Sequence, residues 1–112
     1  MKIYYNKKEI EVPVRSVSGF GKISGLMFRS RETENLLFDL ERESRMAIHS
    51  YFVFFPFLAV WLDGENRVLE FRKVRSFTFS VSPEKKFRKL VEIPINSENE
   101  GIIEFLVGRR KV

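Results

Sequence analysis

The sequence predicts a mainly β fold, a single-domain antiparallel sandwich or barrel-like arrangement with one or two short helices. Short segments in which apolar and polar residues alternate recur at roughly ten-residue spacing between turn residues, a pattern typical of sandwiches and barrels. The most apolar segment, residues 46–62, is rich in Phe, Tyr and Val, which favour strands. The length of 112 residues matches one domain, residues 1–112, whose core needs no cross-links.

Residues 2–5 and 9–15 are expected to form a hairpin, because apolar and polar residues alternate in the second segment. Asn6 begins the turn between them, since Asn tolerates a positive φ. Pro13 cannot donate to a sheet ladder, so this strand is expected at an edge.

The segment that follows, residues 16–30, predicts a short helix. Ser18 can cap it, and Phe20, Ile23 and Met27 fall on one helical face.

Three shorter elements lead to the apolar centre of the chain. The polar residues 29–35 predict an exposed loop, residues 36–40 a strand, and the charged residues 41–45 a turn.

The central segment 46–62 predicts two strands, 47–55 and 57–62, buried on both faces and separated by Pro56. Its 17 residues lie at the lower limit of the roughly 17–25 that span a membrane, and His49 and Pro56 interrupt it. No membrane span is therefore expected.

The chain then predicts a hairpin and a further strand. Residues 63–66 are strong turn formers, and residues 67–74 return as the hairpin partner. Phe77, Phe79 and Val81 alternate with polar residues, which predicts a half-buried strand.

The C-terminal part predicts two more strands. Residues 82–85 form a turn or the first turn of a short helix, and residues 91–95 form a strand whose pairing Pro94 limits. Residues 96–101 predict a polar loop and residues 102–107 the last strand.

The composition bounds the class of protein. The absence of Cys excludes disulfides, thiolate zinc sites and Cys nucleophiles. The N-terminus has no apolar signal region, so a cytoplasmic protein is expected. The chain has no Gln and 13 Glu against 2 Asp, a bias similar to that of hyperthermophile proteins.

The net charge of +5 is concentrated in residues 67–89, which carry eight Lys and Arg against two Glu. Basic surfaces attract nucleic acid or acidic partners. The candidate nucleic-acid-binding residues are Arg72, Lys73, Arg75, Lys85, Lys86, Arg88 and Lys89. The other interpretation is a β-meander with solvated basic faces.

Aromatic rings stand among these cations, at Phe71, Phe77, Phe79 and Phe87. Exposed rings could stack on bases, whereas buried rings belong to the core. Because Phe77 and Phe79 share the alternation of Val81, the pattern favours burial.

His49, the one imidazole, is a weak catalytic candidate. A general base needs a carboxylate or a substrate within reach, and Asp63 or Glu92 could supply the carboxylate. The alternative is a strand His bonded to backbone or hydroxyl groups. One His, no Cys and two Asp predict no metal site, and glycines spaced G-x-G-x-x-x-G miss the dinucleotide fingerprint, so no cofactor is expected.

Several short motifs occur together in an order similar to that of an uncharacterised family, domain of unknown function 192. They are GLMFR at 25–29, LLF at 36–38, HS at 49–50, VWLD at 60–63, LVEIP at 90–94 and VG at 107–108. The resemblance implies a compact β-rich fold with a short helix at the GLM segment, and it supplies no catalytic residues to carry over to this chain. The chain departs from the family at Leu58, where many members have Asp, and at residues 51–55, where many have a polar stretch.

Three functions follow from this sequence as hypotheses. The first is a noncatalytic binding or accessory domain of unknown ligand, and an enzyme is the less favoured class. The alternatives are a nucleic-acid-binding module that uses the basic segment 67–89, and a small enzyme that uses His49. We expect a monomer, or a dimer through an edge strand near Pro13 or Pro94.

Overall fold

The structure, a computed structural model, describes residues 1–17, 33–47, 53–78 and 80–108. Its elements in chain order are β1 (Lys2–Tyr5), β2 (Lys8–Glu11), β3 (Arg15–Ser16), β4 (Leu36–Ser44), β5 (Phe57–Leu62), β6 (Val68–Val74), β7 (Phe87–Pro94), the 3₁₀ helix η1 (Ser97–Asn99) and α1 (Glu100–Val107). The predicted helix within residues 16–30, Phe79 and His49 lie outside the described residues.

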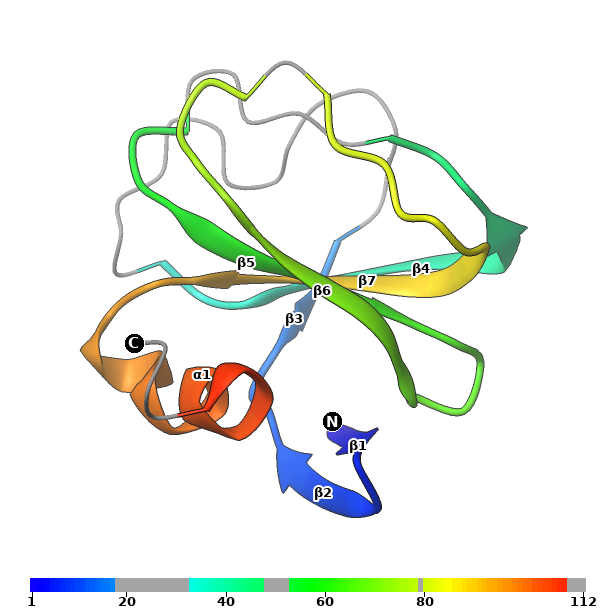
Figure 1. Ribbon diagram of the computed structural model, residues 1–112, viewed down its shortest axis with the longest axis horizontal. Coiled ribbons are helices and arrows are strands. Elements are labelled where there is room, and N and C mark those ends of the chain that lie inside the picture. Colours follow the sequence, from blue (N-terminus) through cyan, green and yellow to red (C-terminus); the bar gives the residue numbers. More distant parts are fainter. Residues whose placement is uncertain (18–32, 48–52, 79, 109–112) are drawn as a thin grey trace.

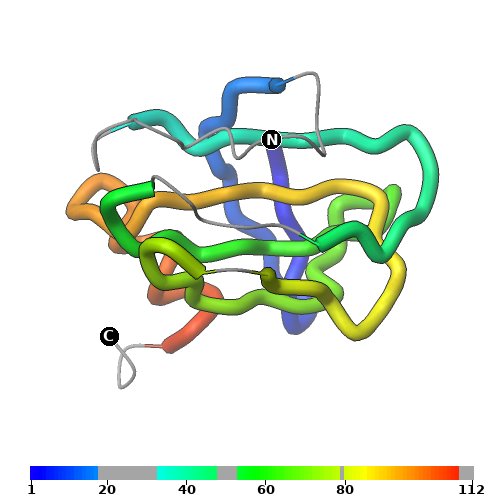
Figure 2. The backbone as a smooth tube through the Cα atoms, turned by 90° about the horizontal axis from the view of Figure 1, so that it is seen from above, coloured from blue at the N-terminus to red at the C-terminus, as the bar shows by residue number. Residues whose placement is uncertain are grey.

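Five strands form the main sheet, in the order β3-β4-β7-β5-β6 (Figures 1 and 2). The pairs β4·β7, β7·β5 and β5·β6 are antiparallel, and the short β3 pairs parallel with β4. The strands β1 and β2 form a separate antiparallel hairpin. The prediction of a mainly β fold is confirmed.

The strand β5 is buried on both faces, as the sequence predicts for residues 57–62. Period-2 alternation sends its odd-numbered side chains to one face of the sheet and its even-numbered side chains to the other. The first group is Phe57, Ala59 and Trp61, and the second is Leu58, Val60 and Leu62.

Different elements cover the two faces of the sheet. Figure 1 shows α1 and the β1–β2 hairpin on one side, where Ile3, Ile102 and Leu106 pack against the even-numbered side chains of β5. On the other side Phe55 and Val81, from the segments before β5 and before β7, pack against the odd-numbered ones. Both faces are therefore covered by segments close to the ends of the sheet strands.

The last element is a helix, so the predicted strand at 102–107 and the predicted loop at 96–101 are wrong. Ile102, Ile103 and Leu106 are buried at helical i, i+1 and i+4 spacing. The Asn96 side chain accepts a hydrogen bond from the backbone N–H of Asn99 at 3.0 Å and caps η1. Packing on the sheet thus selects a helix from an apolar run that also suits a strand.

The predicted turn at 41–45 is also wrong, because β4 continues to Ser44. The strand continues through a β-bulge. Glu41 has φ 65°, and the pairing of β4 with β7 shifts register between Asp39 and Ser44. The Asp39 carboxylate accepts a hydrogen bond from the backbone N–H of Glu41 at 2.9 Å, which fixes this bulge.

Two further strand predictions are wrong. The first is the strand expected at 47–55, because its described residues 53–55 are not in a strand. Phe77 lies in a turn with φ 58° and is 51% exposed, and residues 78 and 80 of the predicted half-buried strand at 77–81 are not in a strand. Positive φ interrupts the alternation on which that prediction depended.

The hairpin turns are confirmed. Asn6 and Lys7 have φ of 52° and 63° between β1 and β2, and the turn at 63–66 joins β5 to β6. The strand that contains Pro94 is not an edge strand, because β7 lies between β4 and β5. Pro94 is the last residue of β7. Its missing backbone N–H therefore interrupts no hydrogen bonds farther along the strand.

Candidate functional site

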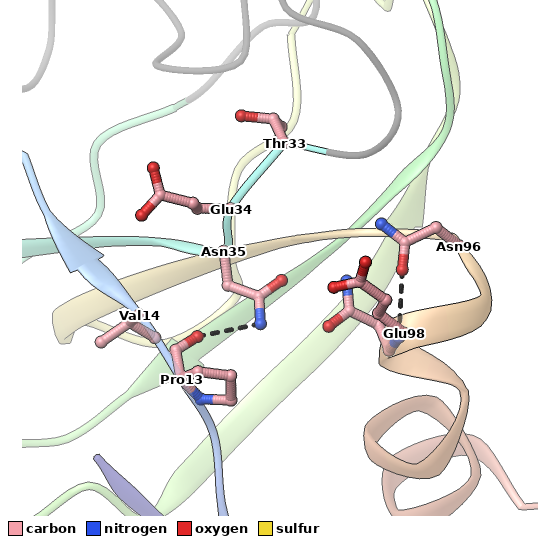
Figure 3. Close-up of a pocket in the computed structure, with 8 residues that line it drawn as sticks. Pro13, Val14, Thr33, Glu34, Asn35, Asn96 and Glu98 are labelled. Atoms are coloured by element: carbon pink, nitrogen blue, oxygen red, sulfur yellow. Dashed lines mark hydrogen bonds between the residues drawn. The ribbon is translucent and has the colours of Figure 1, made fainter.

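A polar cavity of about 220 Å³ lies where β4 begins and β7 ends (Figure 3). Segments far apart in the sequence meet there: the connection between β2 and β3, the residues before β4, and η1. The residues that line the cavity are Pro13, Val14, Thr33, Glu34, Asn35, Asn96, Glu98 and Asn99.

Asn35 forms one wall of this cavity and is 4% exposed. Its Nδ2 donates to the carbonyl oxygen of Pro13 at 3.0 Å, and its backbone carbonyl accepts from the backbone N–H of Arg15 at 2.9 Å. Its Oδ1 is buried and has no hydrogen-bond partner among the described residues. A buried amide oxygen without a donor is destabilising, by about 1–3 kcal/mol.

Asn99 also lines the cavity and is 5% exposed. Its Nδ2 donates to the carbonyl oxygen of Pro94 at 2.7 Å, which ties η1 to the end of β7. Each of the two buried amides thus donates one N–H to a backbone carbonyl. Its side-chain oxygen is a hydrogen-bond acceptor.

The charge of the lining is negative. Glu34 pairs with Nε of Arg15 at 3.2 Å, whereas no ion pair in the described part of the chain includes Glu98. Among the described residues that line it there is no Lys, Arg or His, and no thiol. The arrangement can hold a ligand that donates hydrogen bonds, and it offers no general base beyond its carboxylates.

Sequence reasoning missed these residues. Asn35 was expected in an exposed loop, and Asn96 and Asn99 in another. Asn followed three residues later by Asn and then by an apolar run is a local signal for a capped helix at 96–107. No local signal marks Asn35, because its partner Pro13 is 22 positions away.

The seven basic candidates do not share one face. Arg72 and Lys73 are neighbours on β6 and point to opposite faces of the sheet, opposite Ala59 and Leu58 of β5. The guanidinium of Arg72 pairs with Glu70 and lies 5.8 Å from the ring centre of the buried Trp61.

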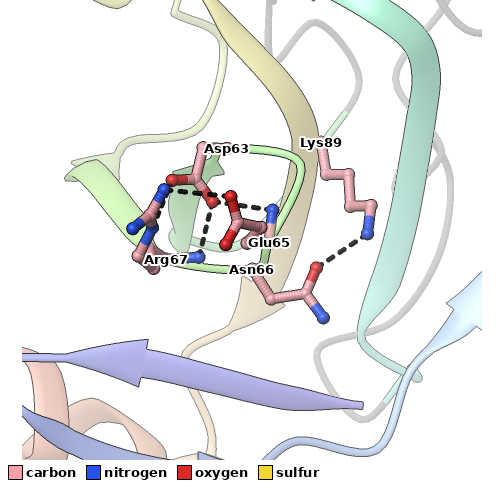
Figure 4. Close-up of polar contacts among 5 residues, drawn as sticks. All are labelled: Asp63, Glu65, Asn66, Arg67 and Lys89. Atoms are coloured by element: carbon pink, nitrogen blue, oxygen red, sulfur yellow. Dashed lines mark hydrogen bonds and ion pairs between the residues drawn. The ribbon is translucent and has the colours of Figure 1, made fainter.

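Two other candidates are bound to polar neighbours. Arg88 donates from Nε to Asp39 at 3.0 Å, and Lys89 donates to Oδ1 of Asn66 at 2.7 Å (Figure 4). The backbone N–H of Glu41, and after it Arg88, lower the pKa of the Asp39 carboxyl. The remaining three, Arg75, Lys85 and Lys86, are exposed on the connection between β6 and β7.

Asp63, a possible partner of a catalytic His, is engaged in the turn after β5 (Figure 4). Its Oδ1 accepts from the backbone N–H groups of Glu65 and Arg67 at 2.9 Å, and its Oδ2 accepts from Nε of Arg67 at 2.7 Å. Burial raises the pKa of the Asp63 carboxyl, but these hydrogen bonds outweigh it and the net shift is downward. Glu92, the other carboxylate, is 1% exposed within the central strand.

The exposed surface carries a pair of aromatic rings. Phe54 and Phe77 are 59% and 51% exposed, and their ring centres lie 5.3 Å apart in an edge-to-face arrangement. The expectation that Phe77 is buried is therefore wrong. Phe87, by contrast, is fully buried and belongs to the core.

Comparison with known proteins supports an uncharacterised family. No family model matches the sequence. A UPF0127 protein from Thermococcus gammatolerans is 30% identical over 76 residues, which cover 66% of this chain and 49% of the relative. The chain thus spans about half the length of the curated relative it matches.

A solved structure has a similar fold. It is a protein of unknown function from Novosphingobium aromaticivorans, with a TM-score of 0.62 and 14% sequence identity, over 84% of this chain and 69% of that one. Neither similar protein has an assigned role, so the expectation of an uncharacterised function is confirmed. Among the described residues, no helix is long and apolar enough to cross a membrane.

Proposed function

We propose that this chain is a noncatalytic binding domain that takes a small polar ligand in the cavity between the start of β4 and η1. The observation that carries the proposal is the Oδ1 of Asn35, which is buried at the wall of a cavity of about 220 Å³ and receives no hydrogen bond from any described residue. Native proteins rarely leave such an atom unpaired, and a ligand that donates a hydrogen bond would satisfy it.

The proposal includes membership of the domain of unknown function 192 family, one domain over residues 1–112, and a place in the cytoplasm. Support for the family comes from the order of the GLMFR, LLF and LVEIP motifs and from the similarity to the UPF0127 protein.

A ligand screen by NMR tests the binding proposal. The nitrogen-15-labelled chain is mixed with a library of small polar compounds, and the side-chain NH₂ signals of Asn35 and Asn99 are followed. We expect a subset of compounds to shift both signals and to raise the melting temperature, because a ligand at 100 times its Kd stabilises the native state by about 2.7 kcal/mol.

The matched variants are Val14→Phe, which enlarges a side chain of the lining, and Val107→Phe, which adds the same ring at a half-buried position of α1 outside the lining. Binding should disappear in Val14→Phe and persist in Val107→Phe. Hits that bind both variants equally, or a screen in which neither amide responds, would exclude this cavity as the binding site.

A second candidate function, binding of single-stranded nucleic acid, is favoured by one observation. Phe77 was expected in the core and is instead 51% exposed, two residues from the exposed Arg75. An exposed ring beside a cation can stack on a base while the cation contacts phosphate. Arg72 and Lys73 point to opposite faces of the sheet, which argues for a smaller contact than the sequence suggested.

Fluorescence anisotropy tests this candidate. Labelled single-stranded RNA and duplex DNA are titrated with the chain at about 50 and 200 mM salt, a range over which several phosphate contacts produce a large loss of affinity. Phe77→Ala should weaken binding to the single strand by about fivefold or more. Tyr4→Ala, at a ring of 39% exposure in β1, is the control. Absence of binding at the lower salt would eliminate the candidate.

A further inference from the structure

We propose that the ligand of this cavity is an organic cation, a small compound with a primary ammonium or guanidinium group. This inference rests on the proposed binding function and specifies the chemistry of its ligand. It follows from which hydrogen-bonding groups of the lining are already engaged, from the charge of the lining, and from the size of the cavity.

Each buried amide of the lining uses one N–H of its Nδ2 group to bind the backbone. Nδ2 of Asn35 donates to Pro13 and Nδ2 of Asn99 donates to Pro94, at 3.0 and 2.7 Å. The backbone N–H of Asn99 is likewise engaged, with the Asn96 side chain at 3.0 Å. The Oδ1 of Asn35 is a buried acceptor with no partner among the described residues. Figure 3 shows this oxygen on the side of the amide that faces Glu98.

The charge of the lining selects a cation over a neutral donor. Glu34 and Glu98 are its charged members, and Glu98 has no ion-pair partner in the part of the chain that the structure describes. An anion would meet two carboxylates, whereas an ammonium or guanidinium group supplies three or five N–H donors and the opposite charge.

The size and composition of the cavity fit a small organic cation. A volume of about 220 Å³ holds roughly seven water-sized groups, at about 30 Å³ each. Pro13 supplies an apolar wall for a short alkyl stem, which would lie there while the charged head reaches the oxygens.

A bare metal ion suits this lining less well. Ca²⁺ takes six to eight oxygen ligands, commonly with several carboxylates. Within the described residues, no group of three or more Asp, Glu, His or Cys could hold a metal ion. Calcium is nevertheless a necessary arm of the test, because amide and carboxylate oxygens are the ligands it accepts.

The test titrates four matched probes and calcium chloride into the labelled chain and follows the side-chain NH₂ signal of Asn35. The probes are n-butylammonium, methylguanidinium, the neutral n-butanol and the anion butyrate. We expect the two cations to bind with Kd in the millimolar range and about tenfold more tightly than n-butanol, a difference of about 1.4 kcal/mol. Butyrate should not shift the signal.

Paired variants test the role of charge. Glu98 is exposed, so Glu98→Gln should weaken n-butylammonium binding by about threefold, within the range of exposed charge pairs. Glu100→Gln removes the same charge two positions along, in the first turn of α1 and outside the lining, and should leave binding unchanged. An equal effect of the two variants would overturn the assignment to Glu98 and with it the inference.

The outcomes separate this inference from the proposed function. If n-butanol shifts Asn35 as strongly as n-butylammonium, or if library compounds bind and neither cation does, the binding function stands and the cationic ligand is excluded. A response to calcium alone would replace the organic cation by a metal ion. If neither the probes nor the library shift Asn35, both proposals fail.

Discussion

Asp63 shows how one side chain can organise a turn through hydrogen bonds to its two carboxylate oxygens. These bonds come from Glu65 and Arg67, and they lower the pKa of the carboxyl although burial alone would raise it. The folded-state pKa is therefore below the unfolded value of about 3.9. The ionised carboxylate stabilises the fold above that unfolded value, and this contribution is lost as the pH falls through the folded pKa.

Asp63→Asn should accordingly lower the free energy of unfolding by about 1–2 kcal/mol near pH 7, because the amide keeps one acceptor and loses the charge. The difference from the parent chain should narrow as the pH is lowered to about 2, since the parent then loses the same charge. Urea unfolding followed by Trp61 fluorescence at several pH values measures this. Glu65→Gln, at a side chain 77% exposed, is the control and should show little effect at any pH. A constant difference across the pH range would contradict the assignment.

Neighbouring phenylalanines should differ widely in their contribution to stability. Phe57 is fully buried in the core at the start of β5, whereas Phe54 is 59% exposed. Phe57→Ala should lower the free energy of unfolding by about 3–5 kcal/mol through lost burial and a residual cavity. Phe54→Ala removes the same atoms and should lower it by less than about 1.5 kcal/mol, the range of an aromatic pair. Chemical denaturation of both variants makes the comparison, and equal losses would show that Phe54 belongs to the core.

At the scale of single residues, sequence reasoning succeeds where the determinant is local. The positive φ of Asn6 and the burial of Trp61 follow from residue type and from immediate neighbours. The buried positions of Asn35 and Asn99 do not, because their amides are held by the carbonyl groups of Pro13 and Pro94. An Asn beside a strand is ordinarily exposed, so only the assembled fold reveals such a contact.

At the scale of elements, α1 shows why a short apolar run is ambiguous. Residues 102–107 contain five apolar residues in six positions, which fits a buried strand or a packed helix equally well. The helix prevails because Ile102 and Leu106, four positions apart, reach the same face of the sheet. The strand β5 was predictable because its turn follows at once, whereas the strand expected at 77–81 fails at the positive φ of Phe77.

Two glycines, one inside α1 and one directly after it, provide a direct test of the helix. At Gly101 no atom lies within 4 Å of the place that a Cβ would occupy, so Gly101→Ala should raise the free energy of unfolding by about 0.5–1 kcal/mol. Gly108 follows the last turn with φ 93°, a conformation that disfavours side chains. Gly108→Ala should therefore lower the free energy of unfolding, although no atom lies within 4 Å of its Cβ position either. Thermal and urea unfolding of both variants measures these changes in the free energy of unfolding. Destabilisation by Gly101→Ala would argue against a helix at this position.

At the scale of the whole molecule, the two hydrophobic clusters share one set of strands. The radius of gyration of 12.8 Å is close to the roughly 13 Å expected for a compact chain of this length. One cluster contains Trp61 and Phe57 and the other contains Leu106, and β5 contributes alternate side chains to both. Loss of packing on either face therefore removes support from the same central strand.

This shared strand predicts that the chain unfolds as one cooperative unit. Leu106 is 5% exposed on α1, so Leu106→Ala should lower the free energy of unfolding by about 2–4 kcal/mol. The fluorescence of Trp61, on the opposite face of the sheet, should report the whole of that loss, because neither face can persist without β5. Hydrogen exchange at the amides of α1 gives the second measurement, and the two free energies should agree. If the Trp61 transition stayed at its original denaturant concentration while α1 exchanged faster, the helix would be a separately unfolding layer.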